Sequence, residues 1–248
     1  MMEKLSNEDL QRRFHDVEEN LKVIRENIAE AAARAGKSAS DITLLAATKT
    51  VPVEVINHSI ELGVDHIGEN RVQELNEKYE SYNLERCELH FIGHLQLNKV
   101  KYLIGRVAMI QSVDSEKLAA EISRLSAKKG VTTDVLLEVN IGKEPNKSGV
   151  MPELLPELVE KVSLLPNIRV RGLMAIPPAN ASETETMNFF LRMNQYFVDI
   201  KHKKTDNVSM DWLSMGMSAD YTQAILAGAN LVRVGTALYG PRIYVKKH

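Results

Sequence analysis

Short apolar runs alternate along the sequence with longer segments of helical composition, and this alternation restricts the fold more than any other feature. Eight apolar runs have the length and the branched residues typical of buried strands. We predict these strands at residues 42–48, 64–67, 89–92, 109–113, 135–139, 170–175, 208–213 and 231–234. Segments that predict helices lie between them, among them 53–62, 115–129, 152–165, 183–201 and 221–227.

Strands that alternate with helices pair in parallel, because each crossover helix returns the chain to the same edge of the sheet. Eight such units in about 210 residues predict a (β/α)8 barrel, a TIM barrel, which typically needs about 250 residues. A doubly wound open sheet is the alternative, but no G-x-G-x-x-G turn follows the first predicted strand. We therefore expect an α/β fold in which residues 42–244 form one barrel.

The residues before the first strand predict an additional amphipathic helix. Apolar residues recur every three or four positions, at Phe14, Val17, Leu21, Ile24 and Ile28. Gly36 has the residue type that commonly ends a helix. We expect residues 1–36 to pack on the barrel as part of a single domain that spans residues 1–248.

Charge and composition argue against several classes of partner. With 31 Lys+Arg and 33 Asp+Glu, the net charge of −2 gives no basis for binding nucleic acid or a membrane surface. No apolar run approaches the roughly 20 residues that span a bilayer, and the amino terminus lacks the apolar segment of a secretory signal. A single cysteine suits a reducing compartment. We expect a cytoplasmic protein.

Polar residues follow several predicted strands at the carboxyl ends, where barrels of this type build their active sites. Lys49 ends the first strand, although its position alone is more typical of a solvated strand terminus. "SMGMS" (214–218) and "VRVGT" (232–236) place glycines, hydroxyls and free amides after strands seven and eight, where many barrels bind phosphate. A lysine amine in an apolar pocket can form a Schiff base with an aldehyde. Pyridoxal 5'-phosphate (PLP) carries both the aldehyde and the phosphate.

Six motifs, in this order along the chain, resemble the PLP homeostasis proteins of the YggS/PROSC family. They are "LLAATKT", "GENRVQE", "HFIGHLQLNK", "GLMAIPP", "SMGMSADY" and "VRVGTALYG". The resemblance extends from about residue 20 to residue 244, and it implies a fold-type III PLP-binding barrel similar to the amino-terminal domain of alanine racemase. The sequence departs from the family pattern at Ala47-Thr48, where Val-Ser is usual, and at Val51, where a lysine is common.

The resemblance implies a cofactor-binding role for ten residues and implies no metal ligand. They are Lys49, Asn70, His90, Met174, Ser214, Met217, Ser218, Arg233, Gly235 and Thr236. Lys49 would form the Schiff base, while Ser218, Gly235 and Thr236 would hold the phosphate, with Ser214 and Met217 lining that loop. Arg233 would face the pyridine nitrogen, and Asn70 would lie beside the ring near its 3-hydroxyl group. Met174 and His90 would line the pocket.

Three functions fit these residues. The first is a non-catalytic PLP carrier, with transient apo-enzyme partners, which we expect to be a monomer. The second is a weak PLP-dependent amino-acid racemase of fold type III, and the third is an aldolase that uses Lys49 without a cofactor.

Racemisation needs a second base opposite the lysine, which racemases take from an additional carboxyl-terminal domain. Because the chain ends 12 residues after Thr236, we expect no such domain and favour the carrier. The sequence does not decide whether Lys147 is a second site of PLP attachment.

Overall fold

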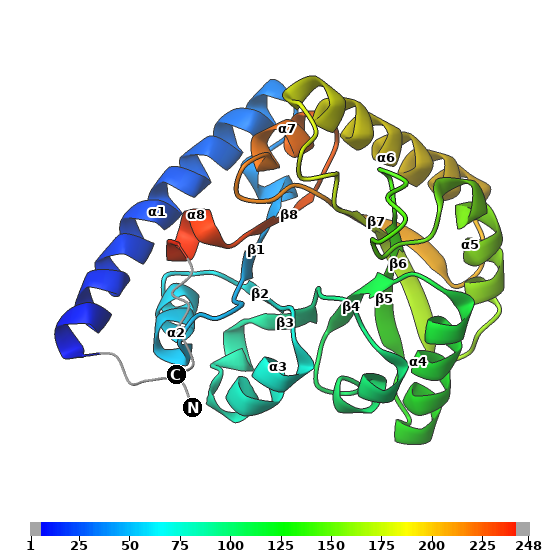
Figure 1. The fold of residues 1–248 in the computed structure, drawn as a ribbon, viewed down its shortest axis with the longest axis horizontal. Helices are drawn as coiled ribbons and strands as arrows, with labels where there is room; N and C mark the ends of the chain where they lie inside the picture. Colours follow the sequence, from blue (N-terminus) through cyan, green and yellow to red (C-terminus); the bar gives the residue numbers. More distant parts are fainter. Residues whose placement is uncertain (1–5, 242–248) are drawn as a thin grey trace.

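The computed structural model describes residues 6–241, in which eight parallel strands close into a barrel (Figure 1). The strands are β1 (Thr43–Ala47), β2 (His66–Glu69), β3 (Glu88–Phe91), β4 (Met109–Val113), β5 (Thr133–Val139), β6 (Ile168–Ala175), β7 (Val208–Ser214) and β8 (Leu231–Val234). Each strand pairs with the next one along the chain, and β8 closes the ring against β1. The predicted barrel is confirmed, and the open-sheet alternative is excluded.

Helices surround the strands and supply the outer layer of the barrel (Figure 1). They are α1 (Asn7–Arg34), α2 (Val53–Glu61), α3 (Val72–Lys78), α4 (Glu116–Lys129), α5 (Leu155–Ser163), α6 (Glu183–Lys203), α7 (Tyr221–Leu226) and α8 (Thr236–Tyr239). Short 3-10 helices lie at Ala39–Asp41, Tyr79–Ser81, Leu84–Arg86, Leu97–Tyr102 and Pro152–Leu154.

The predicted strand–helix alternation is interrupted between β3 and β4. This connection contains a 3-10 helix, Leu97–Tyr102, in place of an α-helix. Val100, Leu103 and Ile104 are buried there, and Gly105 then reverses the chain with a positive φ of 71°. The segment from Leu97 to Ile104 therefore covers the barrel between β3 and β4 with the apolar side chains of a single turn.

The amino-terminal helix α1 completes the outer layer of helices next to α8, the shortest α-helix of the described residues. Helix α8 has only four residues, and α1 contacts α2, α7 and α8 along its length (Figure 1). Of the predicted apolar face, Val17, Leu21, Ile24 and Ile28 are buried, and Phe14 is partly buried. The helix ends at Arg34, and Gly36 follows with a φ of 70°, which confirms the predicted amphipathic helix and its end.

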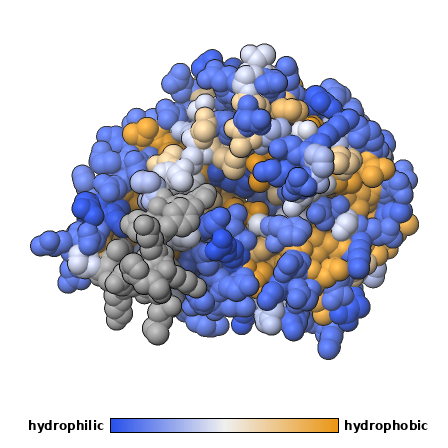
Figure 2. All heavy atoms as spheres, in the orientation of Figure 1, coloured by the Kyte–Doolittle hydropathy of each residue, from blue (hydrophilic) through white to orange (hydrophobic). Residues whose placement is uncertain are grey.

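The apolar core has two layers. Its larger part lies between the strands and the helices, and two small clusters around Leu45 and Leu136 lie inside the barrel. Polar side chains occupy much of the remaining barrel interior, and Figure 2 shows that hydrophilic residues also cover most of the viewed face. Within residues 6–241, no helix has both the length and the apolar content needed to cross a bilayer.

Candidate functional site

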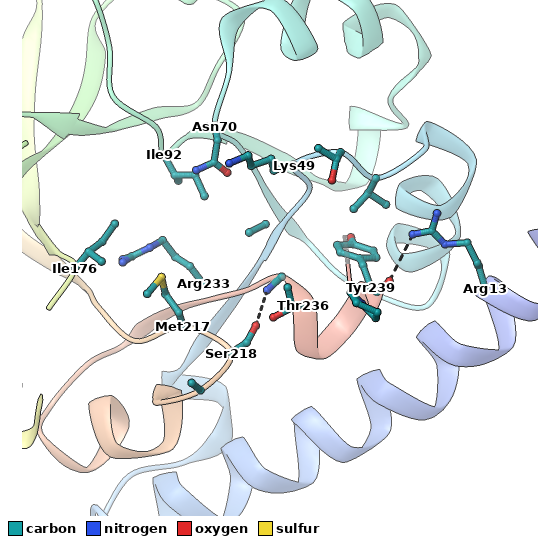
Figure 3. Close-up of a pocket in the computed structure, with 17 residues that line it drawn as sticks. Arg13, Lys49, Asn70, Ile92, Ile176, Met217, Ser218, Arg233, Thr236 and Tyr239 are labelled. Carbon is teal, nitrogen blue, oxygen red and sulfur yellow. Dashed lines mark hydrogen bonds between the residues drawn. The ribbon is translucent and has the colours of Figure 1, made fainter. Parts of the chain in front are cut away.

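A cavity of about 330 Å³ opens at the carboxyl end of the barrel (Figure 3), a size at the lower end of small-molecule pockets. The cavity is lined by Arg13, Ala47, Lys49, Thr50, Val51, Asn70, Ile92, Ile176, Met217, Ser218, Ala219, Arg233, Gly235, Thr236, Tyr239, Gly240 and Pro241. Seven of the ten residues singled out from the sequence are among them. The segments that carry these seven residues are far apart in the chain and meet because strand ends converge in a closed barrel.

Lys49 lies in a tight turn directly after β1, and its half-buried side chain extends toward Asn70 (Figure 3). The next residue, Thr50, has a φ of 62°, which is unusual for a β-branched residue. The Thr50 amide donates to Glu74 Oε2 at 2.8 Å, and Lys78 Nζ donates to the Thr48 carbonyl at 3.4 Å. Two side chains from α3 therefore hold the backbone on both sides of Lys49.

A buried ion pair supports this turn from outside the barrel. Lys78 Nζ lies 3.0 Å from Glu69 Oε1, and the Tyr82 hydroxyl donates to the same oxygen at 2.7 Å. Both charged side chains are almost inaccessible, at 8% and 0% exposure. Burial and the Glu69 carboxylate raise the pKa of Tyr82, so its phenol keeps the proton that it donates.

The opposite side of the cavity presents groups suited to an anion. Ser218 Oγ accepts hydrogen bonds from the amides of Gly235 and Ala237, each at 3.1 Å, and this brings the loop after β7 against the start of α8 (Figure 3). Thr236 is exposed to the cavity between these two amides. A Cβ at Gly216 would lie 2.5 Å from the Ala224 side chain, so this turn requires glycine.

Arg233 brings a buried cation to the cavity floor. Its guanidinium donates to Ser214 Oγ at 2.6 Å and to the Ala175 carbonyl at 3.0 Å, and the residue is only 4% exposed. Burial lowers the pKa of Arg233 to about 10, so the group is still protonated at neutral pH. Arg233 can therefore only donate hydrogen bonds to a ligand.

Three sequence-derived residues, Met174, Ser214 and His90, are not among the residues that line the cavity. They are fully buried inside the barrel beneath it. Ser214 Oγ donates to Gln111 Oε1 at 2.7 Å, and Gln111 Nε2 lies 2.9 Å from His90 Nδ1. The position of a residue along its strand does not show whether its side chain lies at the cavity floor or in the buried layer below the floor.

Several lining residues could not be recognised from strand ends. Arg13 reaches the cavity from α1, where its guanidinium lies 3.5 Å from the Tyr239 carbonyl (Figure 3). Tyr239 lines the cavity, but its hydroxyl is hydrogen-bonded to Ser59 Oγ at 2.8 Å, and burial raises its pKa. The exposed Lys147 lies in a separate loop, whose backbone is held by the Asn140 side chain.

We expect Glu138→Gln to change how stability depends on pH. Burial and the nearby Asp114 raise the pKa of Glu138 from 4.5 to about 7, against the opposing effect of Arg233. The folded protein therefore holds a proton that the unfolded chain releases, so stability falls as pH rises between these two values. Relative to the wild type, the glutamine variant should gain up to about 3 kcal/mol at pH 8 and little at pH 4.5. Urea unfolding at both pH values tests this, and parallel pH profiles for the two proteins would contradict it.

The cavity supplies the Lys49 amine, the guanidinium groups of Arg13 and Arg233 and the hydroxyls of Ser218 and Thr236 around a partly apolar space. This set of groups fits a small carbonyl compound that also carries a phosphate. The amine can attach to the carbonyl carbon, while the hydroxyls can bind the anion. The geometry thus agrees with the ligand class predicted from the sequence.

Residues 20–243 match the family model "Alanine racemase, N-terminal domain". A pyridoxal phosphate homeostasis protein of Aquifex aeolicus is 45% identical over 226 residues, which cover 91% of this chain and 98% of that protein. A crystal structure of an unknown protein from Bifidobacterium adolescentis has a TM-score of 0.88 at 34% identity, covering 96% of this chain and 98% of that one.

PipY of Synechococcus elongatus, solved with PLP bound, is 32% identical, with a TM-score of 0.75 over 86% of this chain and all of PipY. These matches cover between 86% and 96% of this chain. The chain belongs to the pyridoxal phosphate homeostasis protein family, whose barrel is the alanine racemase N-terminal domain.

Proposed function

We propose that this protein binds PLP in the cavity, holds it as a Schiff base on Lys49 and serves PLP homeostasis in the cytoplasm without turning over amino acids. One observation carries the proposal: Lys49, Arg233 and the loop around Ser218 and Thr236 face one another across a single cavity. In this proposal the protein acts as a monomer and passes PLP to apo-enzymes through transient encounters.

Each part of the cofactor has a matching group in the cavity. PLP supplies an aldehyde that condenses with an amine and a ring that can withdraw electrons from a bound amino acid. The Lys49 amine would attach the aldehyde, and the Ser218 and Thr236 side chains would hold the phosphate beside Gly235. Asn70 lies beside Lys49, on the side where the ring would pass (Figure 3). The turn-holding contacts from Glu74 and Lys78 keep the amine directed into the cavity.

Two relatives support the cofactor and the role. The relative from Aquifex aeolicus is named a pyridoxal phosphate homeostasis protein, and PipY was solved with PLP bound. Both match most of the length of this chain. We extend PLP binding to this protein on the basis of these similarities and the cavity chemistry.

The cavity chemistry also argues against amino-acid turnover. Arg233 would be the partner of the pyridine nitrogen, and a donor-only partner favours the unprotonated nitrogen, which withdraws electrons weakly. Racemisation also requires a second base opposite Lys49. Tyr239 lines the cavity, but its hydroxyl is bonded to Ser59 and its pKa is raised, so this phenol is poorly suited to accept a proton.

The match to the alanine racemase domain keeps a weak racemase as the second candidate. Incubating the PLP-loaded protein with a panel of L-amino acids, followed by chiral chromatography, distinguishes the two functions. The carrier role predicts no conversion beyond that caused by free PLP at the same concentration. Sustained multiple turnover that disappears in Lys49→Ala would establish the racemase instead.

We expect the double variant Ser218→Ala, Thr236→Val to lose affinity for PLP by about 100-fold or more, because each of the two lost hydrogen bonds to a charged group contributes about 1.5–3 kcal/mol. Equilibrium dialysis measures the change. Pyridoxal, which lacks the phosphate, should bind the variant and the wild type equally. An equal loss for PLP and pyridoxal would show that these side chains do not hold the phosphate.

A further inference from the structure

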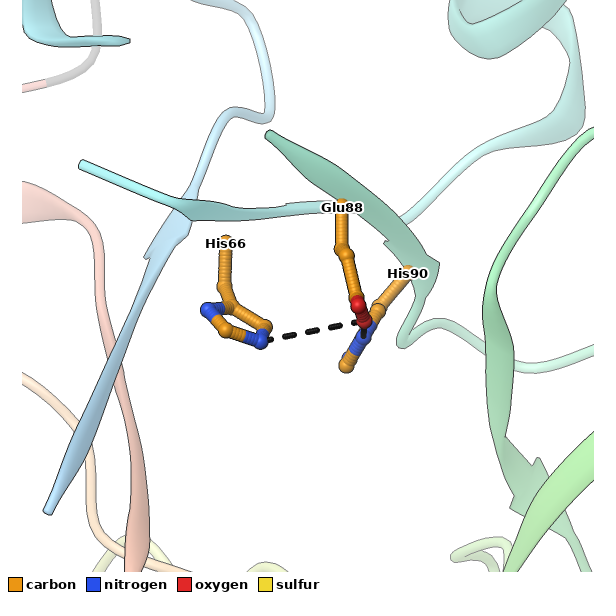
Figure 4. A group of neighbouring side chains, drawn as sticks. All are labelled: His66, Glu88 and His90. Carbon is orange, nitrogen blue, oxygen red and sulfur yellow. Dashed lines mark hydrogen bonds and ion pairs between the residues drawn. The ribbon is translucent and has the colours of Figure 1, made fainter. Parts of the chain in front are cut away.

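A second group of chemically active side chains lies at the amino end of the barrel, opposite the cavity. His66 begins β2, while Glu88 and His90 belong to β3 (Figure 4). Glu88 Oε2 lies 3.8 Å from His66 Nε2 and 3.4 Å from His90 Nε2, and the donor atoms of all three residues lie within 4.8 Å of one another. The cavity residues and the proposed function do not use this group.

The spacing of these atoms suits a four-coordinate metal ion. Zinc binds imidazole nitrogen and carboxylate oxygen at about 2.0–2.2 Å, which places neighbouring ligands of a tetrahedron roughly 3.4 Å apart. The two distances from Glu88 are close to this value, so small side-chain rotations would complete the geometry. The Glu88 side chain is 61% exposed, so an ion can enter the site from solvent. The same exposure lets a water molecule occupy the fourth coordination position.

Both imidazoles are already held in orientations that suit metal binding. His66 Nδ1 lies 2.8 Å from Asp65 Oδ1, so Nε2 faces Glu88. This is the carboxylate–histidine arrangement that commonly supports metal ligands. His90 Nδ1 lies 2.9 Å from Gln111 Nε2, which likewise directs its Nε2 toward Glu88.

The surrounding charges do not oppose a cation. Arg171 and Arg169 lie nearby, but Asp134 accepts hydrogen bonds from both, at 2.6 Å and 2.7 Å. Asp211 accepts a further hydrogen bond from Arg171 at 2.6 Å. The two guanidinium charges are thus matched by two carboxylates, and Glu88 adds a negative charge to the group.

We propose that His66 Nε2, Glu88 Oε2 and His90 Nε2 form a site for a divalent transition metal of the zinc class. Two imidazoles and one carboxylate favour zinc and its neighbours over magnesium or calcium, which prefer oxygen ligands. A metal site could not be predicted from the sequence, because these three residues come together only when β2 and β3 pair in register.

Metal binding has a structural consequence for the barrel interior. A metal on His90 Nε2 requires the proton on Nδ1, so Gln111 must turn its amide to present Oε1 to that proton. Gln111 also accepts from Ser214, which in turn accepts from Arg233 at the cavity floor. Occupancy of the metal site therefore rearranges a hydrogen-bonded chain that ends at Arg233.

The single tryptophan of the chain provides a local probe. The Trp212 ring lies 6.2 Å from the His66 ring, so Co²⁺ bound by His66 should quench its fluorescence. We expect saturable quenching at one ion per chain, reversed by added Zn²⁺, and the same stoichiometry for Zn²⁺ by calorimetry. Asp65→Asn should weaken binding by about 10- to 100-fold, the effect typical of a lost supporting partner. His66→Ala and Glu88→Gln should abolish saturable binding.

His58→Ala is the matched control. Like His66, His58 has carboxylates beside its ring, those of Glu18 and Glu61, but it lies on helix α2 and not in the proposed metal site. The control should bind Co²⁺ and Zn²⁺ as the wild type does. The proposal is overturned if the wild type shows no saturable binding, if His66→Ala or Glu88→Gln binds normally, or if His58→Ala loses binding equally. Glu88 is exposed, so Glu88→Gln decides the result even where His66→Ala does not fold.

Discussion

Lys49→Ala should bind PLP only reversibly and raise the dissociation constant by about 100-fold or more, a loss of about 2.7 kcal/mol. Lys49 is the lysine among the described cavity-lining residues, and its turn directs the amine toward Asn70. In the proposed site, Ser218, Thr236 and Arg233 would still bind the cofactor without that amine, but no covalent attachment would form. Equilibrium dialysis and the visible absorption of the PLP-loaded protein measure both effects.

Pyridoxamine phosphate is the sharpest control for this result, because it has the phosphate and the ring but no aldehyde. It should bind the wild type and Lys49→Ala with similar affinity. Lys147→Ala, which changes an exposed lysine outside the cavity, should leave PLP binding unchanged. Undiminished PLP affinity and absorption in Lys49→Ala would contradict the role of Lys49. A wild type whose absorption does not change with PLP would favour the aldolase alternative.

Lys78→Met should lower the free energy of unfolding by about 3–5 kcal/mol, since it leaves the Glu69 carboxylate buried without its partner. Glu69 is fully buried, and even in the wild type the Glu69 Oε2 atom has no hydrogen-bond partner among residues 6–241. The substitution also removes the hydrogen bond to the Thr48 carbonyl. Urea unfolding measures the loss of stability.

Two comparisons separate this effect from a general sensitivity to lysine loss. Lys161→Met removes a lysine that also contacts two carboxylates, Glu116 and Glu157, but on the surface, and it should destabilise the protein far less than Lys78→Met. Adding Glu69→Gln to Lys78→Met should restore part of the stability, because the unpaired charge is then gone. Equal losses for Lys78→Met and Lys161→Met would show that the buried pair does not support the turn.

The barrel could be predicted because its pattern is repetitive. The predicted strand at 109–113 coincides with β4, and the predicted 231–234 coincides with β8. The second strand was placed at 64–67, but β2 runs from His66 to Glu69, because pairing with Glu88–Phe91 sets its limits. Apolar content alone does not determine strand register.

The cavity was predictable where a residue follows a strand directly. Lys49, Gly235 and Thr236 meet this condition, and the rule that barrel sites form at strand carboxyl ends locates them. Arg13 could not be predicted in this way, because it reaches the cavity from α1, a helix that precedes the barrel. His90 and Ser214 lie one layer below the cavity and connect to it only through Gln111 and Arg233. Such contacts depend on side-chain direction inside the closed barrel.

Borohydride reduction of the PLP-loaded protein, followed by peptide mapping, tests the central claim most directly. Reduction fixes the cofactor permanently to the amine that holds it, so the modified peptide identifies the lysine. We predict one modified site per chain, at Lys49, in a protein that shows no turnover of amino acids. Modification at Lys147 or another surface lysine, with Lys49 unmodified, would contradict the account.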